Sequence, residues 1–253
     1  MASATLPLAE VLARNDVWRG DALAEARLPG VSTGFPQLDA ELPGGGWPRG
    51  GLVELLPSRQ GVGEMSLLMP ALAHISSCEL SWVVCVAPPL SPYAPAWAAA
   101  GVSLSRLLIT RAAGGDAAWA CARALEADGV GALIAWLPAG NSAAASATDP
   151  ASNSAILRRL QLLAEKSRTL IFLFRPAAAA HQSSPAPLRI GIEAASAAGC
   201  LSLRLLKRRG GALAAPLELN LARPAPPPSF PAHVVAGHSP SSAAARNLSA
   251  TAA

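Results

Sequence analysis

Continuous apolar runs recur along the chain, separated by turns and by segments with helical periodicity. Short runs without polar interruption are typical of strands buried on both faces. We predict such strands at 52–56, 81–88, 107–110, 132–138 and 169–174. Helices are predicted between them at 65–76, 93–100, 116–127 and 153–167. The alternation predicts an α/β fold, in which helices cover both faces of a parallel sheet.

The pattern changes after Pro187. Residues 188–194, 200–209 and 216–222 alternate apolar and polar positions with a period of two, which predicts half-exposed antiparallel strands. Residues 223–253 are rich in Pro, Ala and Ser and contain no acidic residue, so we expect a disordered tail. A helix is predicted at 5–17. The expected organisation is an N-terminal helix and linker (1–30), a core domain (31–222) and the tail.

Composition narrows the class of protein. Of the 253 residues, 51% are hydrophobic and 14% are charged, which allows a substantial core and argues against wholesale disorder. No apolar stretch approaches the length that a membrane-spanning helix needs, and the first residues do not resemble an export signal. We therefore expect a cytoplasmic protein without membrane contact. The cysteines lack zinc-site spacing and are expected to be small buried hydrophobes; they are Cys78, Cys85, Cys121 and Cys200.

Charge is unevenly distributed along the chain. Residues 1–150 carry eight Arg or Lys and thirteen Asp or Glu, whereas residues 151–253 carry twelve against three. A basic second half suggests contact with an anion, a nucleic acid or an acidic protein surface. Solvated charge scattered by chance is the open alternative.

The loop after the first predicted strand is where an α/β sheet would bind a nucleotide. A P-loop needs a Lys for the β- and γ-phosphates and a Ser or Thr hydroxyl for magnesium. Glu64 occupies the Lys position and Met65 the hydroxyl position, and Trp136 stands where a Walker-B strand would end in Asp. The sequence therefore predicts a degenerate nucleotide loop without ATP turnover, with no cofactor, no metal and no catalytic residue. Its candidate residues are Ser58, Arg59, Gly61, Gly63, Glu64, Met65 and Ser66.

Two interpretations of this loop stay open. Arg59 can contribute charge to an anion, so nucleotide binding without hydrolysis is an alternative. Glu64 can also be simply an acidic residue in the first turn of a helix, where it favours the helix dipole.

Two segments, 32–39 (STGFPQLD) and 42–55 (LPGGGWPRGGLVEL), resemble the entry to the core of the RecA recombinases. The likeness covers about 31–222 and implies a RecA-like three-layer core with a mostly parallel central sheet and an antiparallel C-terminal extension. Within that superfamily, LPGGGWP running into a loop without Lys is most similar to the SulA-like ImuA family of translesion-synthesis accessory proteins. Pro88 and Pro89 depart from the recombinases, which have an activating acidic residue there.

The resemblance implies a non-catalytic adaptor in SOS-induced translesion DNA synthesis. Its implied partners are ImuB and an error-prone C-family DNA polymerase, with RecA as a further candidate and DNA contact weak or indirect. A SulA-type cell-division inhibitor that binds FtsZ is the alternative, and a RecA-like DNA-dependent ATPase is the second alternative.

Several residues are candidates for partner or DNA contacts. Arg175 and Arg189 flank the segment where recombinases place a mobile DNA-binding loop. The other candidates are Trp47, Arg158, Arg159, Lys207, Arg208 and Arg209. Each basic residue can also be ordinary solvated charge, and Trp47 can be a plug under the sheet instead of an anchor for a partner. Trp82 and Trp136 are expected in the core.

Overall fold

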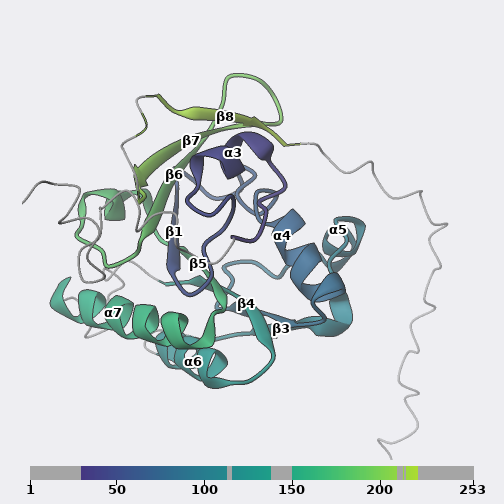
Figure 1. Ribbon diagram of the computed structural model, residues 1–253, viewed down its shortest axis with the longest axis vertical. Coiled ribbons are helices and arrows are strands. Elements are labelled where there is room, and N and C mark those ends of the chain that lie inside the picture. The colour runs from purple at the N-terminus through teal and green to yellow at the C-terminus, as the bar shows by residue number, and fades with distance from the viewer. Residues whose placement is uncertain (1–29, 113–115, 138–149, 210–212, 214, 222–253) are drawn as a thin grey trace, which may run out of the picture.

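The computed structural model describes residues 30–112, 116–137, 150–209, 213 and 215–221, without the side chains of 150–153. The predictions of a helix at 5–17 and of a disordered tail fall on residues outside these ranges. An eight-stranded sheet with the order β3-β2-β4-β5-β1-β6-β7-β8 forms the centre of the described structure (Figure 1). The strands are β1 (Leu52–Pro57), β2 (Trp82–Val86), β3 (Leu107–Thr110), β4 (Val130–Trp136), β5 (Leu170–Phe174), β6 (Leu188–Ala194), β7 (Cys200–Lys207) and β8 (Leu217–Asn220).

The sheet is mostly parallel. Each neighbouring pair from β3 across to β6 is parallel, whereas β6 and β7, and then β7 and β8, pair antiparallel. The predicted α/β class and the antiparallel extension are therefore confirmed. The helical segments are α3 (Pro36–Glu41), α4 (Met69–Ala73), η1 (His74–Cys78), α5 (Ala94–Ala99), η2 (Leu104–Arg106), α6 (Asp116–Glu126), α7 (Pro150–Ser167) and η3 (Ala177–His181).

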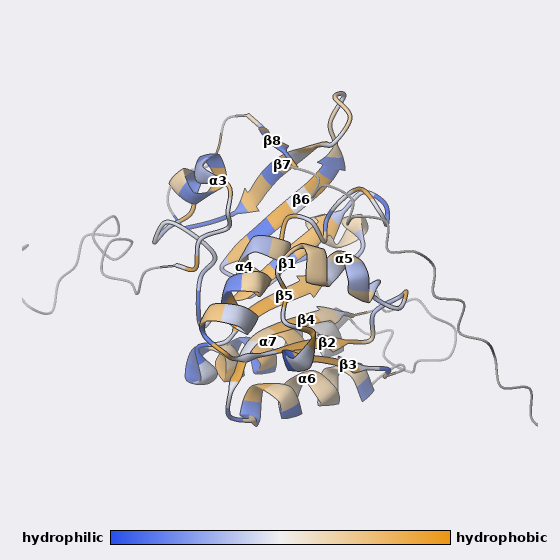
Figure 2. Ribbon diagram, turned by 90° about the vertical axis from the view of Figure 1, so that its right-hand side faces the viewer, coloured by the Kyte–Doolittle hydropathy of each residue, from blue (hydrophilic) through white to orange (hydrophobic). Residues whose placement is uncertain are grey.

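Helices cover both faces of the sheet and create two apolar cores. One core joins the strands to α3, α4 and α5, and the other joins them to α6 and α7 (Figure 1). Because successive side chains of a strand point to opposite faces, a strand between two cores directs apolar side chains into both of them. On β5, for example, Phe172 faces the first core while Ile171 and Leu173 face the second. Figure 2 shows the resulting apolar colour along the central strands.

The segment before β1 closes one side of the first core. Main-chain hydrogen bonds join Val31 to Trp47 in both directions, and a Cβ added to Gly46 would lie 2.3 Å from the Val31 carbonyl oxygen. Only glycine fits this close approach. The Trp47 side chain is fully buried, with its ring edge-on to Phe172 at 5.2 Å between centroids. The structure therefore shows Trp47 as a plug, and it is not an exposed anchor.

The first helix after β1 begins later than predicted. Residues 64–68 form turns, and α4 begins at Met69 instead of at Met65. Proline lacks the N–H that a helix interior needs but is tolerated in the first turn. Because Pro70 is the second residue of α4, the helix begins where this proline is compatible with it.

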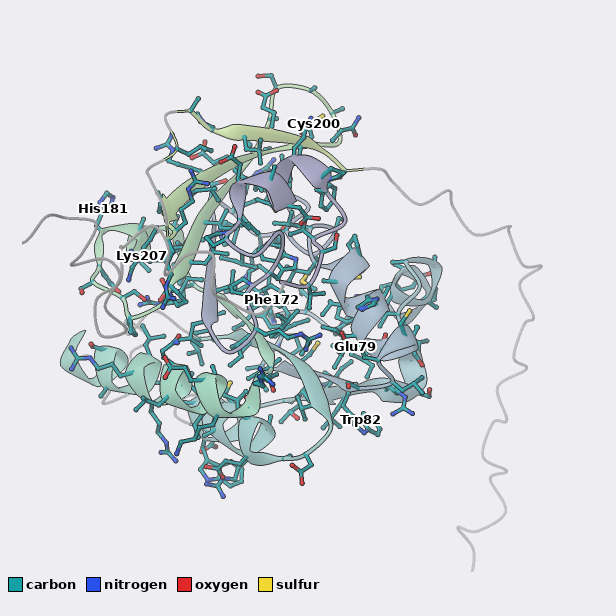
Figure 3. All side chains as sticks on the ribbon, in the orientation of Figure 1. Glu79, Trp82, Phe172, His181, Cys200 and Lys207 are labelled. Atoms are coloured by element: carbon teal, nitrogen blue, oxygen red, sulfur yellow. The ribbon has the colours of Figure 1, made fainter. Side chains whose placement is uncertain are left out.

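Other predictions of burial are wrong. The strand predicted at 107–110 to be buried on both faces is β3, where Leu108 is 51% and Ile109 is 41% exposed because β3 is at the edge of the sheet. Trp82 is 41% exposed because it begins β2 next to the edge of the sheet, and Figure 3 shows it at the margin, whereas Phe172 lies in the centre. Cys85 and Cys121 are buried as expected, but Cys78 is exposed on η1 and Cys200 is only half-buried at the start of β7.

Replacing Trp47 and Trp82 tests these two environments. We expect Trp47→Ala to lower the free energy of unfolding by about 3–5 kcal/mol, because it leaves a large cavity against Phe172. Trp82→Ala, the matched control, should cost less than about 1 kcal/mol because the side chain is partly in water. Urea denaturation followed by circular dichroism measures both values. Equal losses for the two variants would contradict the assignment of Trp47 to the core.

Candidate functional site

A cavity opens at the carboxyl ends of the parallel strands, beside the loop that follows β1. Its volume is about 530 Å³, and we call it the loop cavity. Side chains from the ends of β1, β4 and β5 line it together with the loop. Its lining residues are Pro57, Ser58, Arg59, Gln60, Glu64, Ala87, Pro89, Ala112, Ala117, Trp136, Leu137, Phe174, Arg175, Pro176 and Ala177. This is the edge of an open α/β sheet at which ligands bind.

The Glu64 carboxylate bonds to the main chain of its own loop. Gly61 N–H donates to Glu64 Oε1 and Gly63 N–H donates to Glu64 Oε2, both at 3.0 Å. Gly61 and Gly63 have φ values of 77° and 108°, which favour glycine and allow the loop amides to converge. Converging amides of this kind form an anion-binding concavity. Here the anion is a side chain of the protein itself.

No helix terminus supports the loop. Ser66 N–H donates to the Gly63 carbonyl and Leu68 N–H donates to the Met65 carbonyl, so residues 63–68 form successive turns before α4. The interpretation of Glu64 as an acidic residue in the first turn of a helix is therefore wrong. Its negative charge is satisfied by loop amides because the helix begins five residues later, at Met69.

The loop is held on both sides by β6 and by the strands that follow it. Ser58 N–H donates to the Ile192 carbonyl at 2.8 Å, and a Cβ added to Gly63 would lie 2.8 Å from Leu221 Cδ1. Ser58 and Ser66 are exposed, and Met65 packs against the first core. The Met65 position therefore belongs to the packing of the fold.

The loop cavity holds little positive charge. Among the described residues that line it, Arg59 is exposed and Arg175 is buried against Glu54. Trp136 is stacked on Phe174, with 5.0 Å between ring centroids and 11° between planes. An aromatic pair thus lies where a magnesium site would place a carboxylate. In the ranges that the structure describes, no three His, Cys, Asp or Glu side chains gather as metal ligands.

A buried ionic cluster lies behind this cavity. Glu54, in the middle of β1, is fully buried, and its side chain bonds to Arg175 at the end of β5 and to Arg189 on β6. Arg175 Nη1 lies 3.2 Å from Oε1, and Arg189 Nε lies 2.8 Å from Oε2. The Ser184 hydroxyl also donates to Oε1. Each carboxylate oxygen therefore accepts at least one hydrogen bond.

The two arginines also hold the segment between β5 and β6. Arg189 donates to the main-chain oxygens of Ala179 and Ala180, and Arg175 donates to Gln182 Oε1. The structure thus places both candidate contact residues inside the protein, each 6% exposed, and not on its surface. The sequence did contain a signal for this cluster, namely the acidic residue in the apolar run LVELL, because a buried carboxylate requires a counter-charge. Sequence reasoning missed Glu54.

The remaining candidate cations lie at two places. Arg158 and Arg159 are exposed on α7. At the end of β7, Arg209 is exposed, and Lys207 Nζ donates to the Ser184 carbonyl at 2.8 Å. Arg208 is half-buried, and its Nη1 lies 2.7 Å from Glu41 Oε2. The structure therefore does not gather all the candidate cations at one site.

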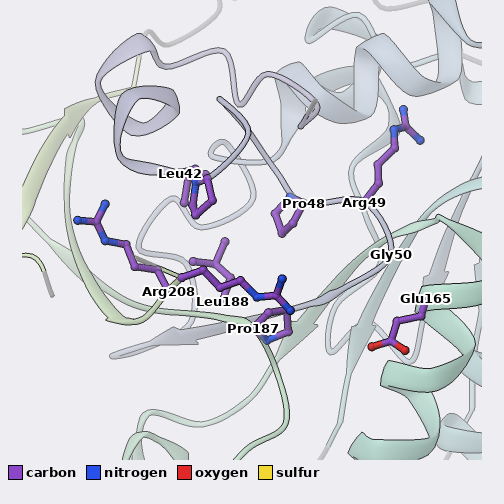
Figure 4. A pocket seen from close by; sticks show the side chains of 10 residues that line it. Leu42, Pro48, Arg49, Gly50, Glu165, Pro187, Leu188 and Arg208 are labelled. Carbon is purple, nitrogen blue, oxygen red and sulfur yellow. The ribbon is translucent and has the colours of Figure 1, made fainter. Parts of the chain in front are cut away.

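A second cavity, of about 360 Å³, opens at the amino-terminal ends of β1 and β6 (Figure 4). We call it the arginine cavity. Its apolar residues come from the turn before β1 and the start of β6, and Arg49 and Arg208 stand on different sides of it in Figure 4. The lining residues are Leu42, Pro43, Pro48, Arg49, Gly50, Glu165, Pro187, Leu188, Arg208 and Arg209. Arg49 forms an ion pair with Glu79. The cavity thus combines an apolar lining with Arg49 and Arg208, each of which has an acidic partner.

The buried thiols are not nucleophiles. Burial raises the pKa of Cys85 and of Cys121 to about 12, so both stay protonated near neutral pH. Because the thiolate is the reactive form, neither thiol offers covalent chemistry.

Comparison with known protein families gave no match, and neither did comparison with curated proteins. No helix within the described ranges has the length and apolar character needed to cross a membrane.

Removing the buried carboxylate tests the ionic cluster. Glu54→Gln should lower the free energy of unfolding by about 3–5 kcal/mol, because it leaves two guanidinium groups buried without a counter-charge. Glu193→Gln, on the exposed part of β6, is the matched control and should be close to neutral. Chemical denaturation measures both. A loss no larger than that of the control would show that the cluster does not hold the fold.

Proposed function

We propose that this protein is a non-catalytic adaptor that acts through protein contacts. The observation that carries the proposal is the pair of hydrogen bonds from Gly61 and Gly63 to the Glu64 carboxylate. A nucleotide phosphate would have to displace this carboxylate and would meet its negative charge. Repulsion between like charges therefore opposes nucleotide binding as well as hydrolysis.

The specific role that we propose is that of an ImuA-like accessory factor in SOS-induced translesion DNA synthesis. The resemblance of segments 32–39 and 42–55 to that family suggests ImuB and an error-prone C-family DNA polymerase as partners, and RecA as a further one. Arg158, Arg159 and Arg209 are exposed and are available to acidic protein surfaces. We propose recruitment as the mechanism, in which no bond is broken.

The segment between β5 and β6 favours protein contacts over DNA contacts. Arg175 and Arg189 are occupied by Glu54 and by main-chain oxygens, so their charge is not available to phosphates. Autonomous binding of single-stranded DNA also needs aromatic side chains for stacking. The exposed residues from Pro176 to Ser183 include no Phe, Tyr or Trp.

Titration with nucleotide tests the role of Glu64. The native protein should show no ATP hydrolysis. It should also show no heat of binding with ATP and magnesium at concentrations up to about 1 mM, because a dissociation constant of about 1 mM corresponds to a binding free energy of only about −4 kcal/mol. Glu64→Ala frees the amides of Gly61 and Gly63 and should gain measurable affinity for inorganic phosphate. Glu193→Ala removes an exposed carboxylate elsewhere and should gain none. Tight ATP binding by the native protein, or DNA-stimulated hydrolysis, would favour the recombinase-like ATPase instead.

Affinity capture with purified partners separates the adaptor from the cell-division inhibitor. The full chain should retain ImuB and not FtsZ, and the double charge reversal Arg158→Glu with Arg159→Glu tests whether α7 forms that contact. Retention of FtsZ alone would overturn the translesion assignment. Retention of neither protein would also count against it.

A further inference from the structure

The β3 edge of the sheet is open in the described structure. β3 pairs with β2 on one side, and among the residues described no strand pairs with its other side (Figure 1). Ala87 N–H donates to the Thr110 carbonyl at 2.8 Å, so the main-chain groups of Thr110 face β2. Since these groups alternate along a strand, the N–H and carbonyl of Ile109 and the carbonyl of Leu107 face outward, whereas the Leu107 N–H donates to the Leu104 carbonyl. They form a template for one more strand.

The side chains on this edge are apolar and in water. Leu108 is 51% exposed and Ile109 is 41% exposed, and they project from opposite faces of the sheet. Trp82 lies on the same face as Leu108, two positions before Val84, the partner of Leu108. The opposite edge differs, because β8 exposes Glu218 and Asn220. Charged and polar side chains protect that edge against pairing, whereas the two exposed side chains in the middle of β3 are apolar.

A hollow of about 510 Å³ lies beside the carboxyl end of β3, and we call it the proline hollow. Ile109 and Arg111 line it from the strand side, and prolines form much of the rest. Its lining residues are Pro88, Pro89, Ser91, Pro92, Ile109 and Arg111. A strand added to β3 would direct alternate side chains toward this face. A hollow at such a position is what gives an added strand its side-chain specificity.

Charge indicates which kind of strand fits. Arg106 and Arg111 flank β3, and residues 101–112 contain no acidic residue. Two copies of this chain paired through β3 would bring four arginines to one short ribbon without a carboxylate. An incoming strand with acidic residues would instead have complementary charge.

We propose that the β3 edge is a docking site for an extended, acidic-flanked strand of a partner protein. The strand bonds to the outward N–H and carbonyl of Ile109 and to the carbonyl of Leu107. It places an apolar side chain in the proline hollow and a carboxylate near Arg111. This site adjoins the loop cavity, with which the proline hollow shares Pro89, but it does not include Glu64. It also does not depend on the identity of the partners proposed above.

A short peptide of matched chemistry tests the site on the full chain. The probe is acetyl-Asp-Val-Thr-Val-Thr-Val-Asp-amide, and the control replaces both Asp with Lys. By NMR titration the acidic peptide should shift the amide signals of residues 107–111, and the Lys peptide should bind at least about tenfold more weakly because attraction becomes repulsion. Equal affinity for both peptides, or no shift at β3, would overturn the proposal.

Two variants examine the two components of the contact. Ile109→Pro removes an outward N–H but none that faces β2, and proline is tolerated on edge strands, so it should abolish peptide binding without unfolding the protein. Arg111→Glu should lower affinity for the acidic peptide and raise it for the Lys peptide. Arg204→Glu, exposed on β7, makes the same charge change away from the site and should alter neither. If Ile109→Pro unfolds the chain, Arg111→Glu still tests the docking site, because an unchanged affinity for both peptides would contradict it.

Hydrogen exchange and sedimentation identify other occupants. In the free full chain, the amide of Ile109 should exchange fast, whereas that of Thr110, which faces β2, should be protected. Protection of Ile109 in a monomer would show that another segment of this chain covers the edge. A dimer that Arg111→Glu dissociates would show that a second copy does. Either result would overturn the proposal.

Discussion

The buried carboxylate of Glu54 sets a condition that three strands must meet together. It lies in the middle of β1, and burial of an unpaired charge is strongly unfavourable. Arg175 from β5 and Arg189 from β6 supply the counter-charge from both neighbouring strands, and their remaining donors bond to η3 and the residues after it. The register of the central strands and the path of the connection between β5 and β6 therefore depend on one ionic cluster.

The fold was predictable to the extent that it follows from the periodicity of apolar residues. Largely apolar runs marked the five strands from β1 to β5, although β1 contains Glu54 and the edge strand β3 exposes Leu108 and Ile109. The period-two segments likewise marked β6, β7 and β8. Element ends were less predictable, since the start of α4 depends on where Pro70 is tolerated. The exposure of Trp82 depends on strand order, which local sequence does not contain.

The candidate site was predictable in its losses but not in its contacts. The sequence shows that the loop after β1 has Glu64 where a P-loop has Lys, and that Trp136 stands where a Walker-B strand would end in Asp. That Glu64 reaches back to Gly61 and Gly63 depends on loop conformation, and the partners of Arg175 and Arg189 depend on strand adjacency. Arginines that flank a loop in sequence can lie on the surface or inside, and only the neighbouring Glu54 decides between these positions.

The hydrogen bonds between Glu64 and its own loop also affect how the loop responds to ligand concentration. In a site that closes around a diffusible ligand, the order of the surrounding chain varies with the concentration of that ligand. A tethered carboxylate is always present at the same local concentration, so the proposed function implies that this loop keeps one conformation at any ratio of ATP to ADP. Any contact made near the loop cavity would then be insensitive to the ratio of ATP to ADP, and its occupancy would follow the abundance of the two proteins alone.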